Sequence, residues 1–355
     1  MMEQYSKLEQ YFATEYSEKE YPTLSLQRAE WAKTRPLEGL EILDATPLCR
    51  NSIYKYMNLI YAGASLSIGQ NPSSSTSEQL LELVREAGIE LVRNDSTPRD
   101  FDIIMDCAAQ FMFFGARLGR VELTRSGAEL YKESGQRVFM ADGGRIKMIE
   151  TCIGTGEGYF RAMDYLGYNN WQGRTLALFG CGKVGQGIFK AAQTRGVEVV
   201  VVSDPALLPD YVVEQAHKVV DYRDRELVTR EVLGCYAMVT AIGQRGAVER
   251  TLSAAELSTS DVLLANMGAE DEYGDSFAAS RILAAKDSLN FILDEPTQLK
   301  YIDATLSLHN LGVEYLINNG SAQEVILPPD DMEQQLLNQT LEHGVISKEL
   351  KELLG

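Results

Sequence analysis

Residues 176–205 read LALFGCGKVGQGIFKAAQTRGVEVVVVSDP. A short apolar run, typical of a buried strand, leads into Gly180, Gly182 and Gly185, which have the spacing G-x-G-x-x-G. A helical segment follows, and the β-branched run 197–202 is typical of a second strand. Strand, glycine turn, helix and strand in this order predict a dinucleotide-binding unit.

Each glycine of this pattern has a separate physical role. The first makes a tight turn, the second lets the backbone approach a pyrophosphate, and the third lets the helix pack closely on the strand. The phosphates then lie at the helix N-terminus, near Lys183 and Val184, where free N–H groups and the helix dipole favour negative charge. A purely structural glycine turn and a site for another nucleotide are the alternatives.

The position that selects the cofactor lies about 20 residues beyond the glycines, where an acidic side chain binds the ribose. Ser203 and Asp204 both fall there. If Asp204 reaches the ribose hydroxyls, the cofactor is NAD; if Ser203 takes that place, discrimination against a 2′-phosphate is weaker. We expect NAD, with NADP left open.

Composition excludes several classes of protein. The formal net charge of −18 argues against nucleic acid or an anionic membrane surface as a partner. We expect no signal peptide and no membrane span, because no basic start precedes an apolar run and no apolar stretch is long enough. Five scattered cysteines indicate reduced thiols and a cytoplasmic protein, and three scattered histidines make a histidine-rich metal site improbable.

The 355 residues are enough for two domains, and strand and helix patterns alternate along both. We expect a first α/β domain at 1–150, completed by 311–355, and a doubly wound Rossmann domain at 151–310. Further strands are expected at 40–45, 65–69, 89–92, 101–106, 137–141, 218–220, 237–241, 262–265 and 290–293, and helices at 146–165 and 276–285. Asn318-Asn-Gly320 predicts a hairpin turn.

Doubly wound sheets bind ligands in the loops at the carboxyl ends of their strands. Two further loops of the second domain are therefore candidate cofactor contacts. They are Thr240-Ala241-Ile242-Gly243 and the segment from Asn266 to Gly268.

The order of elements resembles the S-adenosylhomocysteine hydrolase family. The closest stretch is 173–205, with weaker matches at 37–88, 101–157 and 240–271. The resemblance implies the family's two-domain fold, a tightly held NAD and a homo-oligomer, either dimer or tetramer. It also implies that Thr124 and Ser126 touch the nicotinamide carboxamide, and that Asn266, Gly268 and Asn310 line the cofactor.

The positions of the family's acid–base chemistry differ here. Its histidines fall on Pro47 and Ala269, and its second aspartate on Cys107. Its lysine falls on Ile146, beside Lys147, and the aspartate four residues later falls on Glu150. A substrate different from the family's is therefore expected.

Several polar side chains are candidates for the chemistry. Lys147 and Glu150 are three residues apart, so the lysine would act on a substrate hydroxyl with the glutamate tuning it, or both would form a solvated pair. His309 would be a general acid or base, or a structural histidine. Asp106 ends an apolar strand, where ligand residues gather; the alternative is a polar cap.

Three more residues, Glu122, Arg125 and Asp142, are candidate substrate contacts. Arg125 would hold a carboxylate or phosphate through its planar fork, or lie on the surface. Asp142 precedes two glycines and would contact a ligand or cap a helix.

These features predict an NAD-dependent oxidoreductase acting on a small-molecule secondary alcohol or its ketone. Two alternatives stay open. One is a hydrolase or lyase that uses bound NAD for transient oxidation, and the other is a non-catalytic NAD-binding regulatory protein.

Overall fold

The chain divides into two compact units in the computed structural model, which describes residues 5–13, 16–71, 76–258, 260–320 and 325–354. The first unit is formed by Met1–Ile149 and Gln298–Gly355, and the second by Glu150–Thr297. The expected boundary at 310 falls inside helix α12 (Leu299–Asn318). This helix belongs wholly to the first unit, because its Asp303 accepts hydrogen bonds from the backbone of Thr23 and Leu24 at 2.9 and 3.0 Å.

The second unit is a doubly wound α/β domain. Its five strands are all parallel, in the order β9-β8-β7-β10-β11. The strands are β7 (Thr175–Phe179), β8 (Glu198–Ser203), β9 (Lys218–Asp221), β10 (Ala237–Thr240) and β11 (Leu263–Asn266). The helices are α7 (Thr155–Tyr165), α8 (Lys183–Thr194), α9 (Asp210–Gln215), α10 (Arg225–Leu233) and α11 (Ala254–Ser258).

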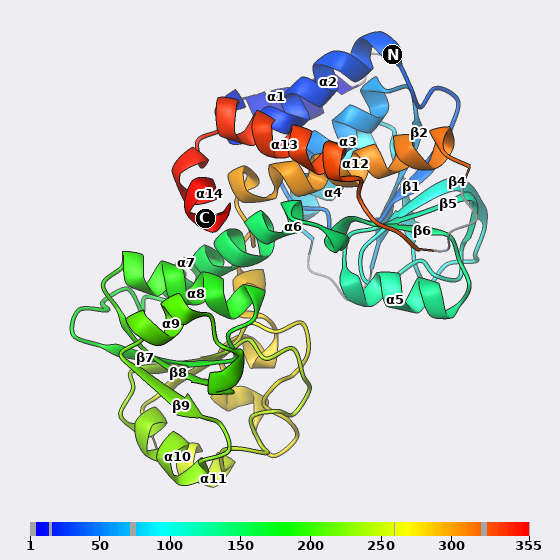
Figure 1. Ribbon diagram of the computed structural model, residues 1–355. Coiled ribbons are helices and arrows are strands. Elements are labelled where there is room, and N and C mark those ends of the chain that lie inside the picture. Colours follow the sequence, from blue (N-terminus) through cyan, green and yellow to red (C-terminus); the bar gives the residue numbers. More distant parts are fainter. Residues whose placement is uncertain (1–4, 14–15, 72–75, 259, 321–324, 355) are drawn as a thin grey trace. The chain divides into compact units, whose positions relative to one another are not determined.

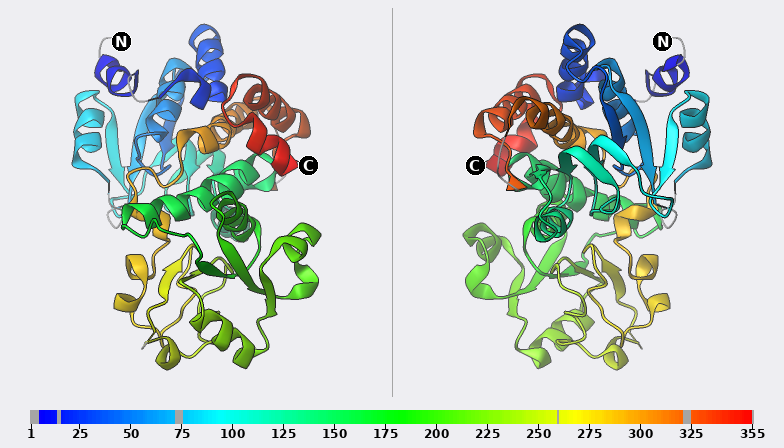
Figure 2. Two further views of the ribbon diagram at one scale, coloured as in Figure 1. Left: turned by 90° about the vertical axis from the view of Figure 1, so that its left-hand side faces the viewer. Right: turned by 90° about the vertical axis from the view of Figure 1, so that its right-hand side faces the viewer.

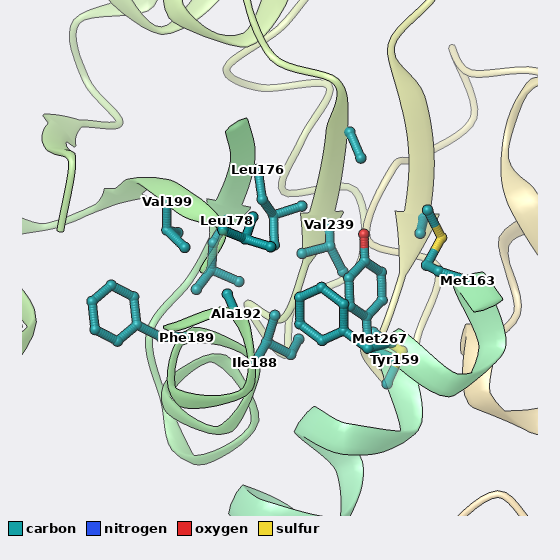
Figure 3. Packing of buried hydrophobic residues seen from close by; sticks show 14 of the residues in the cluster. Tyr159, Met163, Leu176, Leu178, Ile188, Phe189, Ala192, Val199, Val239 and Met267 are labelled. Atoms are coloured by element: carbon teal, nitrogen blue, oxygen red, sulfur yellow. The ribbon is translucent and has the colours of Figure 1, made fainter. Parts of the chain in front are cut away.

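The sheet of the second unit is covered on both faces, which is why the middle positions of its strands are apolar. Leu176 and Leu178 point to the face covered by α7, α8 and α9, whereas Ala177 and Phe179 point to the face covered by α10 and α11. Figure 3 shows the first of these faces, where Ile188 and other α8 residues pack against the strands.

Helices α7 and α8 approach each other through glycines. A Cβ on Gly187 would lie 1.7 Å from the carbonyl oxygen of Cys152, and one on Gly156 would lie 2.2 Å from the carbonyl carbon of Gly187. The helix expected at 146–165 is interrupted here, because a π-helical turn (Ile149–Gly154) separates α6 (Ile146–Met148) from α7.

The first unit is a seven-stranded parallel sheet in the order β3-β2-β1-β4-β5-β6-β12. Figures 1 and 2 show its strands with helices packed around them. The strands are β1 (Glu41–Asp44), β2 (Ser65–Gln70), β3 (Glu90–Arg93), β4 (Asp100–Asp106), β5 (Gly115–Glu122), β6 (Val138–Met140) and β12 (Val325–Ile326). The helices are α1 (Ser6–Ala13), α2 (Pro22–Thr34), α3 (Ser52–Tyr61), α4 (Glu78–Glu86), α5 (Arg125–Glu133), α12, α13 (Asp330–His343) and α14 (Ser347–Leu354). Helix α12 packs against α2, α3 and β5.

Three expectations about secondary structure are wrong. The strand at 290–293 is a short 3-10 helix (Leu289–Ile292), and the helix at 276–285 is two 3-10 turns. The hairpin at Asn318–Gly320 is absent, because the apolar run before it is α12 and β12 pairs in parallel with β6. Strand β5 was not expected from the sequence.

No helix in the described part of the chain is long and apolar enough to cross a membrane. All five cysteines are free thiols. Within the described ranges, no three His, Cys, Asp or Glu side chains are grouped so that they could hold a metal ion.

The close approach of α8 to the π-helical turn gives a stability prediction. Gly187→Ala forces the added methyl into the Cys152 carbonyl group, and we expect a loss of about 2 kcal/mol or more in the free energy of unfolding of the second unit. The measurement is urea denaturation. Gly182→Ala is the matched control, because no atom lies within 4 Å of a Cβ at Gly182. Equal stability of the two variants would contradict the close contact.

Candidate functional site

The glycine turn lies where the strand order of the second unit reverses. Strand β7 has β8 on one side and β10 on the other, so the chain leaves its central strands in opposite directions. Ligands of open α/β sheets bind outside the carboxyl ends of the strands at such a point. The loops that follow β7 and β10 begin at Gly180 and Ala241.

The three glycines of this turn differ in what surrounds them. Gly180 has a φ of +83°, and a Cβ there would lie 2.5 Å from the carbonyl oxygen of Ala241. A Cβ on Gly185 would lie 2.2 Å from the carbonyl oxygen of Gly180. These two glycines are therefore required by the protein's own packing. Gly182 is different: it is exposed, and a Cβ there would meet no atom within 4 Å.

The start of α8 presents backbone donors beside this open position. The first hydrogen bond of the helix runs from the N–H of Gln186 to the carbonyl oxygen of Gly182 at 2.9 Å. The N–H groups of Lys183 and Val184 precede it and have no acceptor within the helix. Open space at Gly182 next to free donors at a helix N-terminus fits a pyrophosphate.

The loop Thr240–Gly243 is held from inside the protein by Glu272, a residue that the sequence reading missed. The carboxylate of Glu272 accepts from the N–H of Ile242 at 2.9 Å and from the N–H of Gly243 at 2.5 Å. Its side chain is fully buried, and burial raises its pKa. Glu272 lies in the acidic run 270–272, so the only sequence signal was a carboxylate close to Asn266.

Asn266 also makes its hydrogen bonds within the protein. Its Oδ1 accepts from the Thr240 hydroxyl and from the Gly268 N–H, both at 3.0 Å, and its amide donates to the carbonyl oxygens of Glu270 and Lys286. A Cβ on Gly268 would lie 2.1 Å from Glu272 Oε1. Asn266 and Gly268 thus shape the loop, and their contact with a cofactor stays a prediction.

The expected ribose position carries an ionised carboxylate. Asp204 follows β8, and its Oδ1 accepts from the Ala206 N–H at 3.1 Å. Its Oδ2 is ion-paired with Arg223, which holds the pKa of Asp204 below its ordinary value. Ser203 is the last residue of β8, and its carbonyl oxygen accepts from the Tyr222 N–H at 3.2 Å. Arg223 was not singled out in the sequence.

The first unit has a strand-order reversal of its own, between β1 and β4. Both strands end in a fully buried carboxylate, Asp44 and Asp106. Asp44 forms an ion pair with Lys55 of α3, and both side chains are fully buried. Thr46 lies two residues after Asp44, and its buried hydroxyl has no hydrogen-bond partner among the described residues. None of Asp44, Thr46 and Lys55 was among the candidate site residues expected from the sequence.

Asp106 and Glu122 hold the loop that follows β4. Asp106 accepts from the N–H groups of Cys107 and Phe111, each at 2.8 Å, and from the Tyr131 hydroxyl. Glu122 accepts from the N–H groups of Ala108 and Ala109 at 2.9 and 3.1 Å.

These carboxylates stabilise an unusual backbone. Ala108 and Ala109 have φ values of 59° and 53°, in the left-handed region that favours glycine. Burial raises the pKa of both carboxylic acids, that of Glu122 to about 7. Asp106 was expected as a catalytic residue and Glu122 as a substrate contact. Both have a structural role in this loop, which the sequence did not reveal.

Thr124 caps helix α5. Its hydroxyl accepts from the Gly127 N–H at 3.2 Å and donates to Glu122 at 2.7 Å. Ser126 and Arg125 follow it and are exposed. Arg125 has no ion-pair or hydrogen-bond partner among the described residues, so its guanidinium is available to an anion.

His309 and Lys147 are both buried in the first unit, on helices α12 and α6, which pack against each other. His309 Nε2 lies 3.0 Å from the carbonyl oxygen of Val121, so this nitrogen carries the proton and Nδ1 is an acceptor. Nδ1 has no partner among the described residues. Burial, and then the charges of Lys55 and Lys147, hold the pKa of His309 well below 6.5, so the ring is neutral.

The other three candidates are placed differently. Asn310 is fully buried in the first unit, where its amide donates to Gln27 Oε1 at 2.9 Å. Glu150 lies in the π-turn of the second unit, so Lys147 and Glu150 do not share one regular helix. Asp142 lies within a 3-10 turn (Ala141–Gly143) and caps no helix, since α6 begins after Arg145.

The raised pKa of Glu122 predicts a pH dependence of stability. Between its ordinary value of 4.5 and about 7, the native state binds more protons than the unfolded state. The stabilisation is therefore full below the ordinary pKa and is lost as pH rises through this window. Relative to Glu122→Gln, we expect the wild-type free energy of unfolding to fall by about 1 kcal/mol per pH unit there.

Urea denaturation of both proteins at several pH values measures this difference. The variant His309→Gln is an internal control of opposite sign, because the pKa of His309 is lowered and its contribution is lost as pH falls below 6.5. A difference between wild type and Glu122→Gln that does not change with pH would show that the carboxylate is ionised throughout.

Comparison with known proteins gives a likeness of fold only. A scan against known protein families finds no match, and neither does a search of curated proteins. Among solved structures, one component of the dipicolinate synthase from Bacillus halodurans is 16% identical over 79% of this chain and 98% of its own, with a TM-score of 0.47.

Two more solved structures are similar at the same level. A component of the dipicolinate synthase from Bacillus subtilis is 13% identical over 80% of this chain and 99% of its own, with a TM-score of 0.47. A transhydrogenase from Sinorhizobium meliloti is 14% identical over 78% of this chain and 94% of its own, with a TM-score of 0.42.

Proposed function

We propose that this protein is an NAD-dependent oxidoreductase that interconverts a small-molecule secondary alcohol and its ketone. The observation that carries the proposal is the open position of Gly182 at the start of α8, where a side chain would meet only empty space. The packing of the protein itself does not require glycine there, whereas a pyrophosphate lying against the backbone does.

The residues of the second unit divide into binding groups and supporting groups. Gly182, Lys183 and Val184 would hold the pyrophosphate, and Asp204 would accept from the adenosine ribose. Glu272 would keep the loop Thr240–Gly243 in shape. When bound, NAD supplies the hydride acceptor at nicotinamide C4.

Proton transfer is assigned to Lys147. When the alcohol is oxidised, its carbon loses a hydride and its hydroxyl proton passes to Lys147 Nζ, which accepts it as the neutral amine. His309 is not assigned a proton-transfer role, because burial and the charges of Lys55 and Lys147 hold its pKa well below 6.5 and make it a weak base. Asp106 and Glu122 are assigned to loop support, because their oxygens accept from backbone N–H groups. Arg125 remains the proposed contact for an anionic substrate group.

A specific observation favours a second candidate, the non-catalytic NAD-binding protein. Three of the expected reactive groups, Asp106, Glu122 and His309, are fully buried and bonded within the first unit. The hydrolase or lyase alternative has no such support, and a homo-oligomer stays a prediction of the family resemblance.

The binding step is tested with Gly182→Val. The backbone of Gly182, with φ −71° and ψ −161°, suits other residues, so we expect the variant to fold as the wild type does. Its side chain would fill the pyrophosphate position, and the Kd for NAD, measured by calorimetry, should rise at least about tenfold. Gly320→Ala, another glycine with open space, is the control. Unchanged affinity in Gly182→Val would remove the basis of the proposal.

The catalytic step is tested by consumption of NADH with a panel of small ketones. We expect Lys147→Ala to lower kcat about a hundredfold or more, as loss of a proton-transfer group does. Lys132→Ala, which removes an exposed lysine of α5, should leave kcat unchanged. Tight NAD binding without turnover of any ketone or alcohol would favour the non-catalytic protein. Thiol release from S-adenosylhomocysteine without net NADH change would favour the hydrolase.

A further inference from the structure

We propose that Arg223 is a 2′-phosphate-binding cation masked by Asp204 and Asp221, so that the protein takes NAD(H) and excludes NADP(H) until Asp204 loses its charge. This inference rests on the proposed function and names the group that selects its cofactor.

Strands β8 and β9 pair in parallel, with Ser203 opposite Asp221. The residues that follow them therefore emerge side by side at the carboxyl edge of the sheet. The N–H of Tyr222 donates to the carbonyl oxygen of Ser203 at 3.2 Å, which ties the two chain segments together. Arg223 comes next and is thereby placed against Asp204, at the position where a ribose carboxylate is expected.

Both terminal nitrogens of Arg223 are engaged. Nη2 is ion-paired with Asp204 Oδ2, and Nη1 donates to Asp221 Oδ2 at 2.9 Å. The backbone N–H of Arg223 also donates to Asp221 Oδ1 at 2.9 Å, which fixes the start of the side chain. A guanidinium held in this way has no free fork for a phosphate.

The charges of the group explain the preference for NAD. One guanidinium and two carboxylates leave a net charge of −1 at the ribose position. A hydroxyl donates readily to a carboxylate, whereas a phosphate monoester carries about −1.5 to −2 and is repelled. The side chain of Arg223 is 54% exposed, so a ligand at this edge can reach it once a carboxylate is removed.

Removing the charge of Asp204 reverses this balance. Arg223 then faces Asp221 alone, the net charge becomes zero, and Nη2 is free to donate to a phosphate oxygen. Removing Arg223 as well leaves only Asp221, which repels a phosphate. Comparing the Asp204 variants with and without Arg223 therefore distinguishes the effect of Arg223 from the effect of losing the Asp204 carboxylate.

The experiment measures the Kd of NAD and of NADP by calorimetry on the full chain. Asp204→Asn is the first variant, because its amide oxygen still accepts from the Ala206 N–H, and Asp204→Ala is the second. We expect the wild type to prefer NAD, and both variants to bind NADP at least about tenfold more tightly than the wild type does, as a gained charge-assisted hydrogen bond allows. Adding Arg223→Ala to either variant should abolish that gain.

Two single variants serve as controls. Arg223→Ala alone should bind NADP no more tightly than the wild type, because both carboxylates remain. Asp261→Ala removes the same charge at an exposed residue two positions before β11, at the opposite edge of the sheet, and should leave the NADP affinity unchanged.

The outcomes separate the two proposals. If the wild type binds neither dinucleotide, the proposed function is wrong. If it binds NAD but the Asp204 variants gain no NADP affinity, or keep the gain without Arg223, the masked-cation inference is wrong and the proposed function stands. A wild type that prefers NADP would also overturn the inference.

Discussion

Backbone N–H groups need acceptors, and in both units buried carboxylates supply them for the loops just beyond the carboxyl ends of the strands. Glu272 does this for the loop that follows β10, and Asp106 with Glu122 does it for the loop that follows β4. These loops lie at the reversal points of the two sheets, where α/β folds place their ligands. The shape of both candidate sites therefore depends on acids that no ligand needs to touch.

This constraint separates the polar residues that build a site from those that remain for chemistry. Asp106, Glu122, Asn266 and Thr124 resemble reactive groups in the sequence, yet their bonds go to neighbouring backbone and side chains. Two candidate groups are open instead, the glycine at the start of α8 and the exposed Arg125.

Elements specified by neighbouring residues could be predicted from the sequence, whereas elements that depend on contacts between distant residues could not. The strand, glycine turn and helix around Gly180 were predictable, because each element is specified by neighbouring residues. Strand β5 was missed, because its residues Gly115–Glu122 alternate weakly and gain strand structure only by pairing with β4 and β6. The hairpin at Asn318 failed for a related reason: a local turn signal says nothing about whether the apolar run before it is a helix.

The sequence by itself determined the two α/β units, the glycine turn and the carboxylate at position 204, because these depend on local spacing and on residue type. Only the tertiary structure decided which side chains meet. Arg223 reaches Asp204 through the register of β8 and β9, and Lys55 reaches Asp44 from a helix that follows the strand. The hydrogen bond to the Val121 carbonyl fixed the proton on His309 Nε2, and burial raised the pKa of Glu122. The physical reason is that pairing and desolvation depend on contacts between distant segments, which the order of residues does not display.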